Sequence, residues 1–327
     1  MYRGRTVAVV VPAHDEAAFV GDVVEAVPGF VDRVYVVDDA SGDDTAAAAL
    51  AAADESPSAR QVDCVDSETG SVDTEAGSVD TEAGSVDTEA GSVDTEAGSV
   101  DTEAGSVDAE RALAVRVAES TPSGRVVVLR HDENRGAGGA VTTGYLAALA
   151  DGVDLVATVD GDGQMDPSRL DRFLDPLVDG EADYATGTRL RRREDRAGMP
   201  AIRLFGNVAL TLLCRVASGY WSLTDPVNGY TAVTREALEA VRPRSMYEGY
   251  GYGVQVLARL HAAGRRAVDV PRRSRYGDED SGIDYGEYAV RVSWLLAATC
   301  LRRLRREHLS EWAPPTPAPT LVRRWRE

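Results

Sequence analysis

The chain has 327 residues, 43% of them hydrophobic, and a formal net charge of −19. This length suffices for one large α/β domain or two smaller ones, and the acidity argues against a general nucleic-acid-binding protein. All 35 residues counted as Lys or Arg are arginine, and this bias together with the acidity is typical of proteins from halophiles. Three cysteines without metal-ligand spacing exclude a disulfide framework. We find no signal peptide and no run of about 20 apolar residues, so we expect a cytoplasmic protein.

Two strand–loop–helix units open the chain. Residues 6–11 are a continuous apolar run, as in a strand covered on both faces, and apolar residues at helical spacing follow over 19–27. Residues 34–37 form a second such strand, followed by an alanine-rich helix from about residue 44.

Acidic residues follow this second strand. A carboxylate at the carboxyl end of a strand can accept a hydrogen bond from a nucleotide base or ribose. For Asp39 we favour this ligand role over helix capping, whereas for Asp43 we favour capping.

An acidic repeat interrupts the second helix. The heptad Gly-Ser-Val-Asp-Thr-Glu-Ala occurs five times over residues 70–104, and an altered sixth copy covers 105–111. One valine and one alanine per repeat cannot form the seam of a coiled coil, and the recurring glycine penalises a helix. We therefore predict a disordered, solvated insert over 63–110, with cation binding as the alternative, and a helix that resumes over 111–119.

A third strand over 125–129 leads to a glycine-rich turn and a helix over 134–145. Glycines let a backbone approach a phosphate closely, and the amino end of a helix favours an anion. The spacing matches neither the Walker phosphate loop nor the dinucleotide fingerprint, so these glycines alone are a weak indication of a nucleotide site.

The next strand ends in two carboxylates. Residues 155–159 are apolar, and Asp160 and Asp162 follow, separated by Gly161. Because open α/β sheets bind ligands outside the carboxyl ends of their strands, both side chains can turn toward one point there. Two hard oxygen ligands suit Mg²⁺ or Mn²⁺, which keep other positions for water and substrate phosphates. The alternative is an acidic loop that only caps the helix opened by Pro167.

Shorter patterns predict the remaining elements. They are a strand over 183–187, an apolar helix over 199–214, helices over 235–241 and 254–263, and a last strand over 268–271. An aromatic–glycine loop over 247–253 precedes the last helix, and its tyrosines either contact a ligand or pack on the sheet.

Five ordered motifs resemble those of family 2 glycosyltransferases. They are Val11-Pro-Ala-His-Asp-Glu16, Val37-Asp-Asp-Ala-Ser-Gly-Asp-Asp-Thr45, Asn134-Arg-Gly136, Val159-Asp-Gly-Asp-Gly-Gln164 and Gly187-Thr-Arg189. They are most similar to the polyprenyl-phosphate branch, the dolichyl-phosphate mannosyl- and glucosyltransferase-like enzymes. The resemblance covers residues 5–300 apart from the repeat. Five motifs in order are far more specific than any one alone.

The resemblance implies a glycosyltransferase-A fold, with a Rossmann-like nucleotide-binding mixed sheet that has helices on both faces. It also implies inverting transfer from a UDP- or GDP-sugar with Mg²⁺ or Mn²⁺, which would neutralise the charge on the leaving nucleotide. Carried over by position, the residues that bind the nucleotide sugar are Pro12, His14, Glu16, Val37, Asp39, Gly136, Asp160, Gly161, Asp162, Gln164, Arg189 and Arg275. Of these, Asp160, Asp162 and Gln164 would hold the metal. His14 stands where the family usually has tyrosine, a change that preserves stacking but can alter base choice.

On the acceptor side, the resemblance assigns the acceptor phosphate to Arg203 and Asn207; the alternative is a surface arginine and a structural asparagine. Residues 225–230 resemble the D-x-x-[SN]-G-[FY] segment of the family, and Asp225 is the candidate catalytic residue. Because a phosphate acceptor is already ionised near neutral pH, Asp225 can position it rather than deprotonate it. The alternative is a turn formed by Asp225 and Pro226.

A loop that folds over the diphosphate in relatives departs from the pattern here. Gly282 replaces the usual lysine, so we expect Arg273 or Arg275 to supply the positive charge.

We expect a catalytic domain over 1–284, a helix over 285–311 and a Pro/Arg-rich tail over 312–327. The helix joins a Trp/Leu face to a cluster of arginines, which fits a helix at the surface of an anionic membrane. Its apolar run is too short to span a bilayer, and a core helix is the alternative.

The residues and the resemblance together predict a metal-dependent, inverting glycosyltransferase at the inner face of the cell membrane. It would move a sugar from a nucleotide sugar to a polyprenyl (dolichyl) phosphate for cell-surface glycan or glycoprotein assembly. One alternative is a family 2 transferase that extends a lipid- or protein-linked glycan. The other is a non-catalytic nucleotide-sugar-binding homologue, against which the intact Asp160 and Asp162 pair argues.

Overall fold

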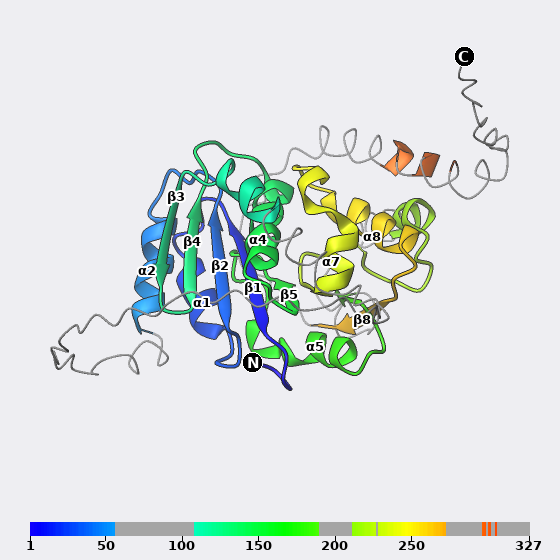
Figure 1. Ribbon diagram of the computed structural model, residues 1–327, viewed down its shortest axis with the longest axis horizontal. Helices are drawn as coiled ribbons and strands as arrows, with labels where there is room; N and C mark the ends of the chain where they lie inside the picture. The colour runs from blue at the N-terminus through cyan, green and yellow to red at the C-terminus, as the bar shows by residue number, and fades with distance from the viewer. Residues whose placement is uncertain are drawn as a thin grey trace, which may run out of the picture.

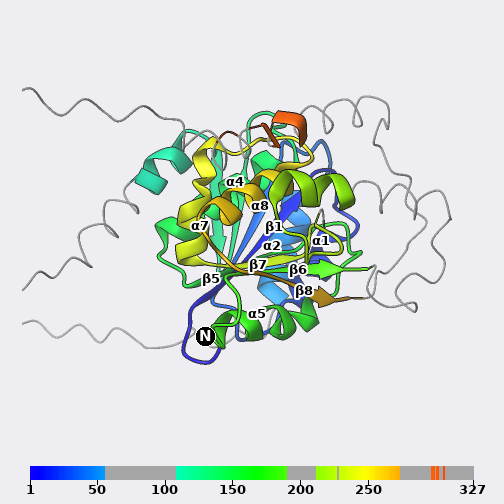
Figure 2. The ribbon, with the colours of Figure 1, turned by 90° about the vertical axis from the view of Figure 1, so that its right-hand side faces the viewer.

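The computed structural model describes residues 1–55, 108–189, 211–226 and 228–272, together with 296–298, 300–301 and 305. Through them runs an eight-stranded mixed sheet in the order β3-β4-β2-β1-β5-β7-β6-β8. Helices cover both faces of this sheet (Figures 1 and 2). The predicted α/β class is therefore confirmed.

Four parallel strands form the first half of the sheet. They are β1 (Val7–Ala13), β2 (Arg33–Asp38), β4 (Val126–Arg130) and β5 (Leu155–Thr158). In the register, Val10 of β1 lies opposite Tyr35 of β2 and Thr158 of β5. Parallel strands end at one edge of a sheet, so the acidic residues after β2 and after β5 are brought to the same edge.

Three strands form the other half: β6 (Tyr184–Thr188), β7 (Thr231–Thr234) and β8 (Ala267–Pro271). β7 is antiparallel to both β5 and β6, and β8 is parallel to β6. The carboxyl ends of β6 and β8 and the amino end of β7 therefore lie at the same edge as the carboxyl end of β5. This topology gathers Arg189, Arg272 and the segment before Thr231 beside Asp160.

Two hydrophobic cores separate the layers. Helices α1 (Val20–Ala26), α2 (Thr45–Glu55) and α5 (Asp171–Val178) contribute to one core, and α4 (Ala137–Ala150), α7 (Arg235–Val241) and α8 (Tyr252–Ala262) to the other. Helix α4 is buried along nearly its whole length because it crosses the centre of the sheet. A Cβ at Gly144 would lie 2.2 Å from Cγ1 of Val10, so only glycine permits this close approach.

Two strands were not predicted, and both ends of one helix were predicted wrongly. Residues 108–114 are helical, so the helix already includes the last three residues of the insert predicted over 63–110. The helix predicted over 111–119 also ends early, since Glu119 begins β3 (Glu119–Ser123). β3 pairs only with β4, at the edge of the sheet, where Pro122 is tolerated. Its polar sequence has no apolar alternation, and the four residues of β7 are too short to give a pattern.

Several predictions lie outside the described residues. They concern nearly all of the heptad insert, most of the 199–214 helix, and the tail over 312–327. The described residues of the predicted C-terminal helix (296–298, 300–301 and 305) are helical. Among the helices in the described ranges, none is both long enough and apolar enough to cross a membrane.

Candidate functional site

Paired carboxylates lie in the loop that follows β5. The N–H of Gly161 donates to the carbonyl of Pro12 at 3.1 Å, which ties this loop to the end of β1. The N–H of Gln164 donates to Oδ1 of Asp162 at 2.9 Å, which closes a tight turn. The turn brings Asp160 and Asp162 within electrostatic range of one another at the carboxyl edge of the sheet.

The surroundings of Asp160 disfavour its ionised form. Burial, and next the neighbouring charge of Asp162, raise the pKa of Asp160 to about 7, although Arg272 and Arg189 act in the opposite direction. The surroundings are tight, because a Cβ at Gly229 would lie 2.3 Å from Oδ2 of Asp160. A buried carboxylate beside a second carboxylate is costly to ionise unless a cation joins them.

The carboxylate pair fits a divalent cation that is shared with a diphosphate. In the part of the chain that the structure describes, no group of three or more His, Cys, Asp or Glu side chains could hold a metal ion by itself. Mg²⁺ commonly uses one or two protein carboxylates and completes its coordination shell with water and substrate phosphates. Asp160 and Asp162 match that smaller requirement, and their excess negative charge is what such an ion would neutralise.

Half-buried Arg189 and buried Asp225 form an ion pair beside this loop. Nε of Arg189 donates to Oδ2 of Asp225 at 2.8 Å, and Nη2 donates to Oδ1 at 3.3 Å. Nδ2 of Asn228 donates to Oδ2 at 3.0 Å, and Asp225 is only 2% exposed. Both carboxylate oxygens are thus engaged, which suits a group that orients Arg189.

Arg272 is a site residue that the sequence reasoning missed. Its Nε donates to Oδ1 of Asn228 at 3.1 Å, and its Nη1 donates to the carbonyl of Gln164 at 3.4 Å. Burial, and next the charge of Arg189, lower the pKa of Arg272, while Asp160 opposes the shift. The available signal was its position directly after a predicted strand.

The predicted cationic role lay instead with Arg273 or Arg275, and both residues are outside the described part of the chain. The same holds for the acceptor-phosphate residues Arg203 and Asn207.

At the other end of the edge, Asp39 is held rigidly. Its Oδ1 accepts the N–H of Arg135 at 2.8 Å and lies 2.6 Å from Nδ1 of His131, while the residue is 3% exposed. Nε2 of His131 lies 2.8 Å from Oγ1 of Thr143 in α4. His131 was not predicted as a site residue; its place one residue after β4 was the only sequence signal.

His14 lies next to Asp39 in one defined tautomer. Its Nδ1 is 2.8 Å from the carbonyl oxygen of Asp39, and because a carbonyl only accepts, Nδ1 carries the proton. The N–H of Gly136 donates to Oδ1 of Asn134, so Nδ2 of Asn134 faces Nε2 of His14 at 3.0 Å and donates to it. The ring that replaces the tyrosine of the family is therefore fixed in orientation.

The loops after β1 and β2 are joined to each other. The N–H of Asp15 donates to Oγ of Ser41 at 3.0 Å, and the N–H of Glu16 donates to Oγ1 of Thr45 at 2.9 Å. Asp15 and Ala40 have φ values of 56° and 57°, a backbone conformation that L-residues seldom adopt and that is common at functional sites.

Asp43 caps the adjacent helix, as predicted, because its Oδ1 accepts the N–H of Thr45 at 3.0 Å. The side chain of Val37 is fully buried in the core on the α4 side.

The glycine-rich turn packs against protein backbone. The N–H of Gly139 donates to the carbonyl of Glu248 at 2.8 Å. A Cβ at Gly138 would lie 2.3 Å from the carbonyl oxygen of Tyr247, and one at Gly136 would lie 2.9 Å from that of Glu248. Close packing on the aromatic–glycine loop thus accounts for these glycines without a phosphate.

Tyr250, in that loop, lies within electrostatic range of the site carboxylates. Its pKa is raised by burial and then by the charges of Asp160, Glu16, Asp162 and Asp39. The hydroxyl therefore lies within electrostatic range of both the Asp160 pair and the Asp39 end. Tyr250 thus senses carboxylates from both ends of the sheet edge.

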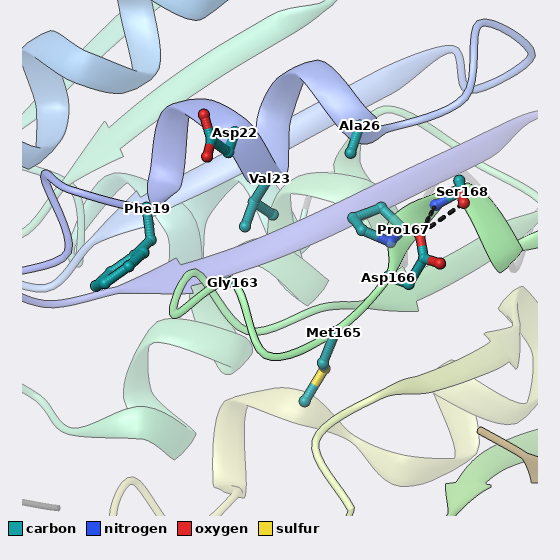
Figure 3. A pocket seen from close by; sticks show the side chains of 9 residues that line it. All are labelled: Phe19, Asp22, Val23, Ala26, Gly163, Met165, Asp166, Pro167 and Ser168. Carbon is teal, nitrogen blue, oxygen red and sulfur yellow. Dashed lines mark hydrogen bonds between the residues drawn. The ribbon is translucent and has the colours of Figure 1, made fainter. Parts of the chain in front are cut away.

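A separate pocket lies between α1 and the loop after β5 (Figure 3). It is lined by Phe19, Asp22, Val23, Ala26, Gly163, Met165, Asp166, Pro167 and Ser168. No predicted site residue lines it. The chemistry-bearing side chains gather at the carboxyl edge of the sheet instead.

Known proteins match this chain in sequence. Residues 103–242 match the family described as Glycosyl transferase family 2. The chain is 30% identical over 117 residues to the UDP-N-acetylglucosamine--dolichyl-phosphate N-acetylglucosaminyltransferase of Methanococcus voltae, covering 36% of this chain and 46% of that protein. It is 32% identical over 179 residues to the undecaprenyl-phosphate mannosyltransferase of Micrococcus luteus, covering 53% of this chain and 72% of that protein.

The fold has solved counterparts as well. Glucosyl-3-phosphoglycerate synthase from Mycobacterium tuberculosis, crystallised with Mn²⁺, UDP and phosphoglyceric acid, superposes with a TM-score of 0.53. The match has 20% sequence identity and covers 92% of this chain and 78% of that one. At this identity the likeness shows the fold alone.

The mixed sheet with helices on both faces and its likeness to the solved synthase give this chain the glycosyltransferase-A fold. The chain belongs to glycosyl transferase family 2. The match to the Methanococcus voltae protein spans 46% of that protein's length, less than half.

Proposed function

We propose that this glycosyltransferase moves a sugar from a nucleotide sugar to a polyprenyl phosphate, with inversion at the anomeric carbon. The observation that carries the proposal is the half-buried Asp160 and Asp162 pair, with Arg272 and Arg189 within electrostatic range of Asp160. The two named transferases above, which act on dolichyl and undecaprenyl phosphate, support the acceptor class. We place the enzyme at the cytoplasmic face of the membrane.

Donor binding uses both ends of the edge. Asp39, His14 and Glu16 would contact the nucleoside. Oδ2 of Asp39, which has no hydrogen-bond partner among the described residues, can accept from a base or ribose. Asp160 and Asp162 would hold Mg²⁺ or Mn²⁺, which supplies Lewis-acid stabilisation of the diphosphate when bound. Arg272 adds a fixed positive charge beside this loop and needs no proton transfer to act.

Acceptor positioning falls to Arg189 and Asp225. Arg189, oriented by Asp225, can hold an anionic acceptor next to the donor. An acceptor phosphate oxygen attacks the anomeric carbon while the bond from that carbon to the nucleotide diphosphate breaks. Because this oxygen is already ionised, no general base is required. Arg203 and Asn207 would complete the acceptor-phosphate contacts.

A transfer assay tests the proposal. Purified full-length chain receives UDP- or GDP-sugars, Mn²⁺, and either a short-chain polyprenyl phosphate or an oligosaccharide, with products read by mass spectrometry. We expect a polyprenyl-phosphate sugar as the product. Its rate of formation should fall at least about a hundredfold in Asp162→Asn and stay unchanged in Asp22→Asn. Transfer only to the oligosaccharide would establish the glycan-extending alternative, and nucleotide-sugar binding without turnover would establish the non-catalytic one.

A further inference from the structure

An apolar surface lies on the outward side of residues 211–218, which form a helix. Leu212, Leu213 and Val216 are 54%, 52% and 40% exposed, and Trp221, just beyond the helix, is 58% exposed. Of the nine large exposed hydrophobic side chains in the described ranges, these are four. Clustered exposure of this kind marks an interaction site, whereas scattered single residues do not.

The inward side of the same helix touches the acceptor end of the site. Oγ1 of Thr211 donates to the carbonyl of Thr224, the residue before Asp225, at 3.2 Å. Burial and then the charge of Asp225 raise the pKa of Cys214 to about 12, so the thiol is near that carboxylate. An α-helix with its side chains is about 10 Å across, so the apolar surface lies about one helix diameter from Asp225.

A second helical segment lies beside this helix. Leu296 and Cys300 pack with Cys214 in a small separate core, and the two segments are neighbours in both views (Figures 1 and 2). Leu301, in that segment, is a fifth exposed hydrophobic residue at 59%.

The local charge differs from that of the protein as a whole. The sequence from 296 to 306 has four arginines and no acid, and 211–222 has one arginine and no acid, in a chain of net charge −19. Of the four arginines, Arg305 is described and is exposed. An anionic lipid surface would repel most of this protein but attract this part.

We propose that Leu212, Leu213, Val216 and Trp221 form a membrane-facing surface that lies in the interface of an anionic bilayer. This inference rests on the proposed function, because a polyprenyl phosphate must bring its phosphate to Asp225 while its tail stays in the lipid. Interfacial helices sink about 5–10 Å into the headgroup boundary, which is close to the one-helix separation found here. The other occupant, a second copy of the chain, gives a different outcome below.

Vesicle flotation tests the surface. The full chain is mixed with vesicles of purely zwitterionic lipid or with added phosphatidylglycerol, and the bound fraction is measured. We expect binding to the anionic vesicles, and a loss of roughly tenfold or more in the double variant Leu212→Glu, Leu213→Glu. The matched control is Val115→Glu, since Val115 is 80% exposed. The helix over 108–114 that it follows lies away from this surface in both views (Figures 1 and 2).

Three results would overturn the inference. They are a parent chain that does not float, a double variant that floats like the parent, and a control that loses binding equally. Conversion of a dimer to a monomer by the double variant, with no change in flotation, would show a second copy on this surface.

Transfer to a water-soluble, short-chain isoprenyl phosphate separates the two proposals. We expect this transfer to change less than about threefold in the double variant, because the substituted side chains point away from Asp225. If vesicle binding follows the prediction but no polyprenyl phosphate serves as an acceptor, the membrane-facing surface is supported and the proposed acceptor is contradicted.

Discussion

His131 and Asp39 form a buried pair in which Nδ1 of the imidazole lies 2.6 Å from Oδ1 of the carboxylate. Both residues are nearly inaccessible, at 2% and 3% exposure. With the N–H of Arg135 on the same oxygen at 2.8 Å, Oδ1 is fully engaged, and no residue in the described ranges bonds to Oδ2, which can face a ligand. Asp39 can therefore present one defined acceptor to a nucleoside, and His131 is the positioning residue that sets it.

Replacement of His131 should weaken donor binding more than turnover. In His131→Leu the hydrogen bond to Asp39 is lost, and a buried bond to a charged group contributes about 1.5–3 kcal/mol. We expect KM for the nucleotide sugar and Kd for the free nucleotide to rise roughly tenfold or more, with kcat changed less than about threefold. Steady-state kinetics and calorimetry measure these quantities.

His261→Leu is the matched control for that variant. His261 packs edge-on against Tyr220, with ring centroids 5.3 Å apart, and has no role in the proposed donor site. Equal loss of kcat and of donor affinity in both variants would mean that His131 only stabilises the fold.

The raised pKa of Asp160 predicts how stability depends on pH. Its folded pKa of about 7 exceeds the ordinary aspartate pKa of 3.8, so the native metal-free protein holds this proton more tightly than the unfolded chain. The stabilisation is fully present below pH 3.8 and is lost as the pH rises through about 7. Asp160→Asn should therefore unfold at a higher temperature than the parent at pH 8 in EDTA, and the gain should shrink as the pH falls toward 5. Calorimetric scans across this range would contradict the assignment if the gain were independent of pH.

The affinity for a divalent metal should depend on pH through the same carboxyl group, Asp160. Because a divalent cation needs the carboxylate form, Mn²⁺ must displace the proton below pH 7, and its apparent affinity should rise up to about tenfold per pH unit from 6 to 7. Titration calorimetry in two buffers of different ionisation enthalpy should detect the release of close to one proton per Mn²⁺ bound at pH 6 and almost none at pH 8. In Asp160→Asn the proton release should vanish along with most of the affinity.

Arg189 and Asp225 should behave as one unit. If Asp225 acts by orienting Arg189, then Asp225→Asn, Arg189→Lys and the double variant should all lower kcat by similar factors, on the order of a hundredfold. Donor KM should change little. Multiplicative losses in the double variant, or a pH–rate profile that loses a limb only in Asp225→Asn, would instead indicate independent roles with Asp225 as a base.

Much of the architecture could be predicted because the strands in the parallel half of the sheet have continuous apolar sequences. The strands over 6–11, 34–37 and 155–159 end in turn or acidic residues, and parallel topology then places those residues at one edge. β3 and β7 escaped prediction because one is a polar edge strand and the other has four residues.

The site was predicted only as far as its motifs. Asp39, Asp160 and Asp162 were found from strand ends and family resemblance, but their partners come from elements distant in sequence. His131 is 92 residues from Asp39, and Arg272 is 108 residues from Gln164. No local pattern identifies such a partner, since its role is created by tertiary packing. The glycines at 136, 138 and 139 show the converse, because a pattern typical of phosphate binding is explained by packing on another loop.

Gly229 offers a test of the carboxylate pair that leaves every ionisable group in place. A Cβ there would lie 2.3 Å from Oδ2 and 2.9 Å from Cγ of Asp160, so Gly229→Ala must displace that carboxylate or its loop. We expect Mn²⁺ affinity and transfer to fall at least about tenfold, while the melting temperature in EDTA drops by only a few degrees. Gly29→Ala is the control, because a Cβ at Gly29 would meet nothing within 4 Å. If Gly229→Ala kept the Mn²⁺ affinity of the parent, Asp160 would not be a ligand, and the metal would have to bind elsewhere at the sheet edge.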